Sequence, residues 1–283
     1  MTKTVFVLSG GASLGASQVG MLQALAEREI QPYLLIGTSA GALNTAFIAG
    51  YPFTPQSVEA LANIWRGLSS LAVFPPDPFS LFRSLRGQTG SLCSNHGLRN
   101  LISRNLTFAN LEDAPIPCQV VATNFLTGQE VTLDNGDACD AVLASAAIPG
   151  IFPPILRDGM TLMDGGLANN TALSQAVAAG ADTIYILPSG YSCALKQVPR
   201  TPLGAAVQAM TILIHQRLVM DINHYARQVN LIVIPPPCPV RVSAANFSKG
   251  AELIDAAYLS ACEALDRNEQ PKDPAAVIDL HTH

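Results

Sequence analysis

The chain has 283 residues, of which 49% are hydrophobic and 13% charged, and its net charge is −5 at pH 7. This composition predicts a globular protein with a large core and excludes a disordered chain. The acidic balance, without a dense cluster of lysine or arginine, argues against nucleic acid as a partner.

Two features argue against export or membrane insertion. No apolar run approaches the roughly 20 residues of a membrane-spanning helix. At the N-terminus, Gly10 and Gly11 arrive before a signal-peptide core could form. We therefore expect a soluble, cytoplasmic protein.

The cysteines are widely spaced and form no CxxC pair, so they predict neither a zinc site nor a disulfide framework. We expect small buried thiols. The six are Cys93, Cys118, Cys139, Cys193, Cys238 and Cys262.

The first predicted strand, Thr4–Ser9, is short, β-branched and apolar, which is typical of a central strand that is buried on both faces. A helix is predicted from Ala16 to Glu29. Between them lies a glycine-rich turn with the sequence Gly10-Gly11-Ala12-Ser13-Leu14-Gly15. Its backbone N–H groups, at the positive end of a helix, suit an anion.

Of the anion sites that such a turn can form, two are excluded. A P-loop would continue with a lysine, and this chain has none there. A dinucleotide site would have its second glycine where this chain has Ala12. It would also have an acidic residue at the end of the next strand, and this chain has none after Leu34–Ile36. An oxyanion hole needs only backbone amides and therefore remains, beside a tight turn without a ligand.

The second predicted strand runs through Leu34–Ile36 into Gly37-Thr38-Ser39-Ala40-Gly41, and a helix follows through Ala49. This strand–turn–helix pattern around Gly-x-Ser-x-Gly is typical of a nucleophile elbow. Gly37 and Gly41 suit a turn in which the backbone approaches too closely for side chains. We predict that Ser39 is a nucleophile.

Further along the chain, helices alternate with strands. This alternation predicts a three-layer α/β/α fold around a central, mostly parallel sheet, in one domain over residues 1–268 with a polar tail over 269–283. Residues 65–86 interleave aromatic and basic side chains, which could pack under a loop or touch lipid. The other predicted elements are helices Thr54–Leu68, Asn95–Arg104, Asp137–Ala146, Leu203–Arg227 and Phe247–Leu265, hairpins over Cys118–Leu133 and Leu156–Met163, and strands Thr183–Leu187 and Leu231–Ile234.

An activated serine needs a proton acceptor. His215 and His224 lie in a predicted helix, and His281 and His283 lie in the tail, so a Ser-His-Asp triad is not convincing. A carboxylate can take the proton directly. Asp164 is the natural choice, because Gly165 and Gly166 follow it and allow a close approach.

Together, the glycine-rich turn, the Gly37–Gly41 motif and Asp164-Gly165-Gly166 resemble the patatin-like phospholipase family of serine acyl hydrolases. Residues 146–154 and Leu167-Ala168-Asn169-Asn170 are similar to its bacterial members. The resemblance implies a Ser39–Asp164 catalytic dyad, a lipid or acyl-ester substrate with peripheral membrane contact, and no metal or cofactor. It also implies an oxyanion hole made by the amides of Gly10, Gly11, Ala12 and Ser13, with Gly15, Gly37, Gly41, Gly165 and Gly166 as motif glycines.

Two residues depart from the family pattern. Ala12 stands where a third glycine is usual, and we expect it to be tolerated only with a negative φ. Leu14 replaces a common arginine or lysine and removes a cation near the oxyanion. These departures motivate an alternative function, a catalytically weak or inactive lipid-binding or regulatory module on the same fold.

Overall fold

A computed structural model describes residues 2–75, 90–189, 198, 200–238, 242–267 and 274–278. Its centre is an eight-stranded sheet in the order β5-β6-β3-β2-β1-β7-β8, with β4 paired to β3. The strands are β1 Thr4–Leu8, β2 Leu34–Thr38, β3 Cys118–Asn124, β4 Glu130–Leu133, β5 Ile155–Arg157, β6 Met160–Asp164, β7 Thr183–Leu187 and β8 Asn230–Val233.

The strands from β3 through β2, β1 and β7 to β8 pair in parallel, whereas β4, β5 and β6 pair antiparallel. On β3, Val121 pairs with Thr38 at the end of β2, and the next residue, Ala122, pairs with Asp164 at the end of β6. Since β4 pairs with both of these β3 residues, it occupies the other edge. The ends of β2 and β6 therefore meet along one edge of β3.

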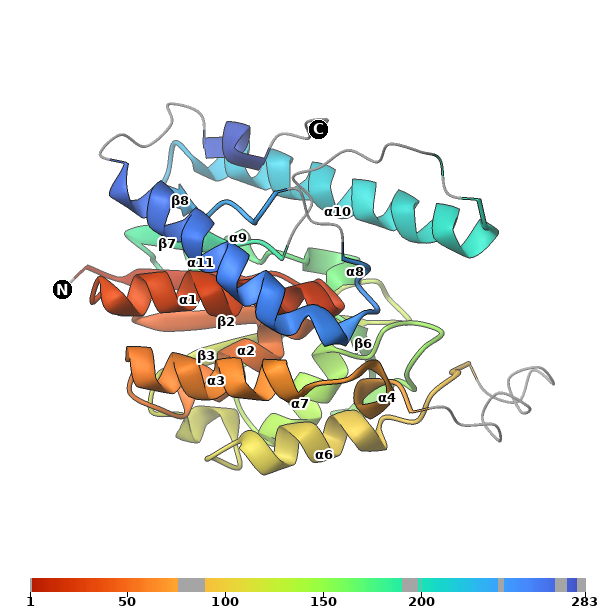
Figure 1. Ribbon diagram of the computed structural model, residues 1–283. Helices are drawn as coiled ribbons and strands as arrows, with labels where there is room; N and C mark the ends of the chain where they lie inside the picture. The colour runs from red at the N-terminus through yellow and green to blue at the C-terminus, as the bar shows by residue number, and fades with distance from the viewer. Residues whose placement is uncertain are drawn as a thin grey trace.

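Helices cover both faces of the sheet, which gives three layers (Figure 1). Successive residues of a strand point to opposite faces. In β1, Phe6 and Leu8 enter the larger core under α1, α2, α3, α6, α7 and α11, while Val5 and Val7 enter a second core with α9 and α10. The fold confirms the predicted α/β/α architecture.

The bounds of the helices follow the sequence predictions closely. For example, Thr54 caps α3 by accepting a hydrogen bond from the Ser57 amide, as the predicted start at Thr54 requires. The helices are α1 Ala16–Glu27, α2 Ala40–Ala49, α3 Pro55–Gly67, α4 Ser70–Val73, α6 His96–Asn105, α7 Ala138–Ser145, α8 Gly166–Asn169, α9 Leu173–Ala178, α10 Pro202–Tyr225 and α11 Gly250–Asp266, with 3-10 turns η1 Ala12–Gly15, η2 Leu111–Asp113, η3 Phe247–Lys249 and η4 Pro274–Ile278.

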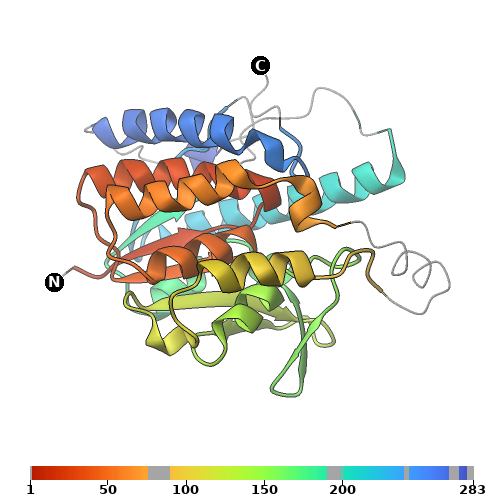
Figure 2. The same ribbon diagram turned by 60° about the horizontal axis from the view of Figure 1, so that its bottom comes forward.

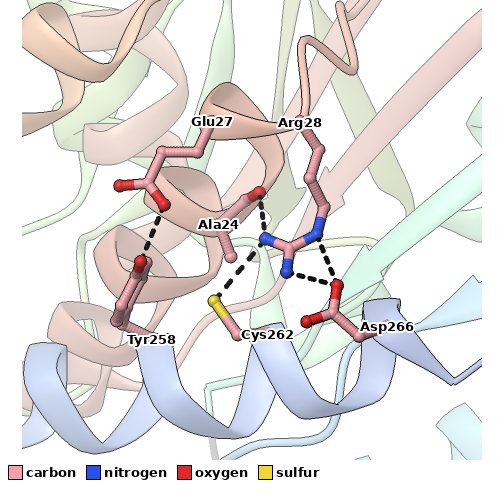
Figure 3. Close-up of polar contacts among 6 residues, drawn as sticks. All are labelled: Ala24, Glu27, Arg28, Tyr258, Cys262 and Asp266. Carbon is pink, nitrogen blue, oxygen red and sulfur yellow. Dashed lines mark hydrogen bonds and ion pairs between the residues drawn. The ribbon is translucent and has the colours of Figure 1, made fainter.

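Helix α11 packs closely along α1. A Cβ atom on Gly20 would lie 2.1 Å from the carbonyl oxygen of Ile254, so only glycine permits this approach. Polar contacts fix the same pair of helices (Figure 3): Arg28 pairs with Asp266, and Tyr258 donates a 2.7 Å hydrogen bond to Glu27. The C-terminal helix is thereby joined to the first helix.

Cys238 and the C-terminal segment differ from the sequence predictions. Cys238 is disulfide-bonded, so the expectation of free thiols is wrong for this residue, whereas Cys118, Cys139 and Cys262 are free thiols. Within the expected polar tail, Pro274–Ile278 forms η4, whose Ala275 and Ile278 are buried in the second core. Neither the disulfide of Cys238 nor the burial of η4 can be predicted from the spacing of residues along the chain.

Candidate active site

Ser39 sits at the turn between β2 and α2 in a strained conformation, with φ 55° and ψ −119°. The glycines around it are sterically required. A Cβ atom on Gly37 would lie 2.4 Å from the carbonyl oxygen of Gly41, and one on Gly41 would lie 2.2 Å from that of Leu8. The turn therefore has the nucleophile-elbow geometry that the sequence predicts.

The hydroxyl of Ser39 donates a 2.7 Å hydrogen bond to Oδ2 of Asp164. The other carboxylate oxygen, Oδ1, accepts a 2.8 Å hydrogen bond from the amide of Gly166. Both side chains belong to buried residues, 6% and 8% exposed. The structure brings the two predicted residues together because β2 and β6 end at the same point of β3.

Burial raises the pKa of Asp164 from its ordinary value to about 6, although the hydrogen bonds from Ser39 and Gly166 favour the charged form. Such a carboxylate is ionised at neutral pH and still basic enough to accept a proton from a hydroxyl during reaction. Gly165 allows this placement, because its Cβ would lie 2.1 Å from the carbonyl oxygen of Val121.

The glycine-rich turn lies against Ser39, because a Cβ atom on Gly10 would be 3.0 Å from that of Ser39. The amide of Gly10 donates to the carbonyl of Asn170 at 3.2 Å, and that of Ser13 donates to Ala244 at 3.0 Å. Among the described residues, the amides of Gly11 and Ala12 have no backbone acceptor. Of the four amides predicted for an oxyanion hole, those of Gly10 and Ser13 are therefore already bonded to carbonyl groups.

Ala12 has a φ of +50°, so the expectation of a negative φ is wrong. The chain turns sharply here from β1 into η1, where the left-handed conformation directs the peptide into the 3-10 turn. An alanine in this region is strained by about 1–2 kcal/mol.

Leu14 is buried in the larger core. Gly15 lies close to α2, where its Cβ would be 2.7 Å from that of Ala40.

An apolar cavity of about 40 Å³ opens beside Ser39. Trp65 and Phe74, from the aromatic and basic segment of the sequence, form part of its wall and pack against Phe247. Phe79, Phe82, Arg83 and Arg86 lie outside the described residues. The cavity is lined by Ala12, Ser39, Ala40, Leu43, Trp65, Leu68, Val73, Phe74, Leu98, Leu101, Ala146, Ile148, Phe152 and Phe247.

Of the histidines considered as alternative bases, His215 and His224 lie on α10, where His224 packs edge-on against Tyr225, and His281 and His283 lie outside the described residues. Ser39 instead donates to the carboxylate.

In the described part of the chain, no group of three or more His, Cys, Asp or Glu side chains could hold a metal ion, and no helix is long and apolar enough to cross a membrane.

Sequence reasoning missed Ser145. Its hydroxyl accepts a 2.8 Å hydrogen bond from the Ser39 amide and donates to the carbonyl of Val121. It also missed the side chain of Asn170, which donates to the Gly10 carbonyl at 3.2 Å. Asn170 belongs to the Leu167-Ala168-Asn169-Asn170 segment, which is part of the family resemblance and could have indicated it. The sequence around Ser145 resembles an ordinary helix end and gives no such signal.

Comparisons with known proteins find chains of similar sequence and similar fold. The family model for patatin-like phospholipase matches residues 6–177. The chain is 29% identical over 187 residues to patatin-like phospholipase domain-containing protein 7 of Mus musculus, and 28% identical over 191 residues to lysophospholipase nte1 of Aspergillus terreus. These alignments cover 65% of this chain but only 13% and 12% of the relatives, so the chain spans about an eighth of their length.

Among solved structures, human GIVD cytosolic phospholipase A2 is similar to this chain, with a TM-score of 0.51 and 11% sequence identity. The likeness covers 93% of this chain and 58% of the human one. At this level of identity, the match supports the three-layer fold.

Proposed function

Because the chain belongs to the patatin-like phospholipase family, we propose that it hydrolyses fatty-acyl esters of lipids, with Ser39 as nucleophile and Asp164 as general base. The observation that carries this proposal is the 2.7 Å hydrogen bond from the Ser39 hydroxyl to a buried carboxylate. The relatives named phospholipase and lysophospholipase support a lipid substrate.

The first half of the reaction acylates the serine. Oγ of Ser39 attacks the ester carbonyl carbon while its proton passes to Oδ2 of Asp164. The tetrahedral intermediate then collapses, the bond to the leaving alcohol breaks, and Asp164 returns the proton to the alcohol oxygen. A positioned base contributes typically about 10²–10⁴-fold to the rate.

We assign the oxyanion hole to the amides of Gly11 and Ala12, because those of Gly10 and Ser13 already donate to carbonyl groups. The N-terminus of α2, which begins next to Ser39, adds a positive potential. One donor of this kind is worth about 10²–10³-fold in rate.

In the second half of the reaction, Asp164 takes a proton from a water molecule, which attacks the acyl-serine carbonyl. The fatty acid leaves as the bond to Oγ of Ser39 breaks, and the proton on Asp164 returns to that oxygen. The dyad is thereby restored without a metal or cofactor entering any step.

A test of this function uses a fluorophosphonate, which forms an adduct with an activated serine. Intact mass and peptide mapping of the wild type should show one adduct on Ser39, and Ser39→Ala should show none. Both Ser39→Ala and Asp164→Asn should lose ester hydrolysis by at least ~10²-fold. Tight lipid binding by a folded wild type that forms neither adduct nor product would favour the alternative, a lipid-binding or regulatory module.

Contact with a lipid surface is also part of the proposal. The N-terminal half of α10 extends past α4 (Figure 1, Figure 2), and residues 205–216 contain no charged side chain. Val207, Met210, Ile212 and Leu213 are exposed there. We expect Val207→Lys to weaken vesicle binding and Leu259→Lys, an equally exposed site on α11, to leave it unchanged.

A further inference from the structure

A second cavity, of about 160 Å³, lies between α8 and α10. It adjoins the dyad on the side of the base. Gly166, which lines this cavity, donates to Asp164, and Asn170, which also lines it, donates to the carbonyl of Gly10. The residues that line it are Gly166, Leu167, Ala168, Asn169, Asn170, Thr171, Leu213, Ile214, Arg217, Leu218 and Asp221.

The two cavities differ in chemistry. The apolar cavity at Ser39 is bounded almost entirely by hydrophobic side chains. The cavity between α8 and α10 carries charge of both signs, because Nε of Arg217 bonds Oδ2 of Asp221 at 2.7 Å within its wall. A guanidinium has four further N–H donors, so Arg217 can bind an anion without releasing its partner.

Asn169 in the same wall has an unused acceptor. Its side-chain nitrogen donates to Glu130 and Ser174 at 3.0 Å each, but its side-chain oxygen has no hydrogen-bond partner among the described residues. The residue is 1% exposed. A buried acceptor without a donor is unfavourable, and a ligand donor could satisfy it.

Ser39 thus lines an apolar cavity, and Gly166, which donates to Asp164, lines a cavity that carries charge of both signs. A phospholipid ester has the same two parts, with an acyl chain on one side of the carbonyl and a polar headgroup on the other. We infer that the cavity between α8 and α10 binds a zwitterionic lipid headgroup, with its phosphate at Arg217 and its ammonium group at Asp221. The inference rests on the proposed ester hydrolysis. A neutral headgroup would leave the charge pair unused, and a purely anionic one would meet the carboxylate of Asp221.

The experiment compares three lipids that share a palmitoyl chain, so that the apolar cavity contributes equally. They are lysophosphatidylcholine, which is zwitterionic, lysophosphatidate, which lacks the ammonium group, and 1-palmitoylglycerol, which is uncharged. For the wild type, kcat/KM for lysophosphatidylcholine should exceed that for palmitoylglycerol by at least ~10-fold, the effect of one charged hydrogen bond.

Arg217→Gln should lower this ratio about 10-fold, whereas Asp221→Asn should lower the rate for lysophosphatidylcholine but not for lysophosphatidate. Arg227→Gln, an exposed arginine beyond α10, is the matched control and should leave all three rates unchanged. Equal wild-type rates for the three lipids, or an equal loss for all three in Arg217→Gln, would overturn the headgroup site while ester hydrolysis stands. Absence of any wild-type hydrolysis would instead refute the proposed function.

Discussion

The side-chain amide of Asn44 donates a 2.8 Å hydrogen bond to the side-chain oxygen of Gln18, and neither residue is exposed to solvent. Asn44 also donates to the carbonyl of Gly15 and accepts from the indole of Trp65, while Gln18 donates to the carbonyl of Ser9. These carbonyls flank the glycine-rich turn. One buried network therefore holds both ends of the segment that carries the proposed oxyanion hole.

We expect Gln18→Met to lower kcat for a soluble ester by about 10-fold or more with little change in KM, because the turn would lose its support while the apolar cavity stays intact. The free energy of unfolding should also fall by about 1–3 kcal/mol, since the amide of Asn44 would lose a partner. Gln23→Met, on the same helix but with its side-chain amide bonded to Glu27, is the control for helix propensity. An unchanged kcat in Gln18→Met would contradict the positioning role.

The pKa of Asp164, about 6, predicts the pH dependence of activity. A general base must be ionised, so kcat/KM should rise as the pH increases through about 6 and level off above 7. The measurement is a profile from pH 4.5 to 8.5 with an uncharged, water-soluble ester. A midpoint near 4 would mean that the carboxylate is not desolvated in the free enzyme.

The same shift affects stability. The pKa of Asp164 in the folded protein is raised above the ordinary 3.8, so the native protein binds the proton more tightly than the unfolded protein does. The stability that protonation of Asp164 contributes is therefore lost as the pH rises from about 4 to 6. Asp164→Asn carries no charge at this position. Its unfolding free energy should therefore exceed that of the wild type by an amount that grows over this pH range and reaches up to ~3 kcal/mol at pH 8, as urea titrations can show.

Ala12 offers a test of strain in the glycine-rich turn. Since its φ is +50°, Ala12→Gly should raise the free energy of unfolding by about 0.5–1 kcal/mol, the relief of strain less the entropy cost of glycine. Ala16→Gly is the control, because Ala16 has a φ of −58° and the change should destabilise by about 1 kcal/mol. Equal destabilisation by both changes would show that the turn relaxes to a negative φ.

The sequence predicts the elbow at Ser39 and the partner carboxylate at Asp164 because both rest on local backbone geometry, which glycines mark. It does not predict why the two meet, since that depends on β6 joining the same edge of β3 as β2. Gln18 was missed for a related reason. Glutamine usually faces solvent, and only tertiary contacts with Asn44 and Ser9 reveal this one as buried.

The apolar cavity beside Ser39 adjoins another apolar cavity between α2, α3 and α6, because Leu43, Trp65, Leu68 and Leu101 line both. We expect an acyl chain that enters beside Ser39 to pass between these side chains. Long acyl chains should reach the cavity between α2, α3 and α6, and short acyl chains should not. Leu101→Trp is therefore expected to lower kcat/KM for palmitoyl esters by at least ~10-fold and to leave butyryl esters within about twofold, since each methylene excluded from an apolar site costs about 0.8 kcal/mol.

The control for this last prediction is Arg104→Trp, which adds the same bulk to an exposed position on α6 that lines neither cavity. It should leave the ratio of palmitoyl to butyryl rates at the wild-type value. A Leu101→Trp variant with an unchanged ratio would mean that the acyl chain leaves Ser39 in another direction, whereas equal losses for both esters would mean that the bulk distorts the dyad. Only a loss that grows with chain length, measured across a series from butyryl to palmitoyl, fits a chain that passes Leu101.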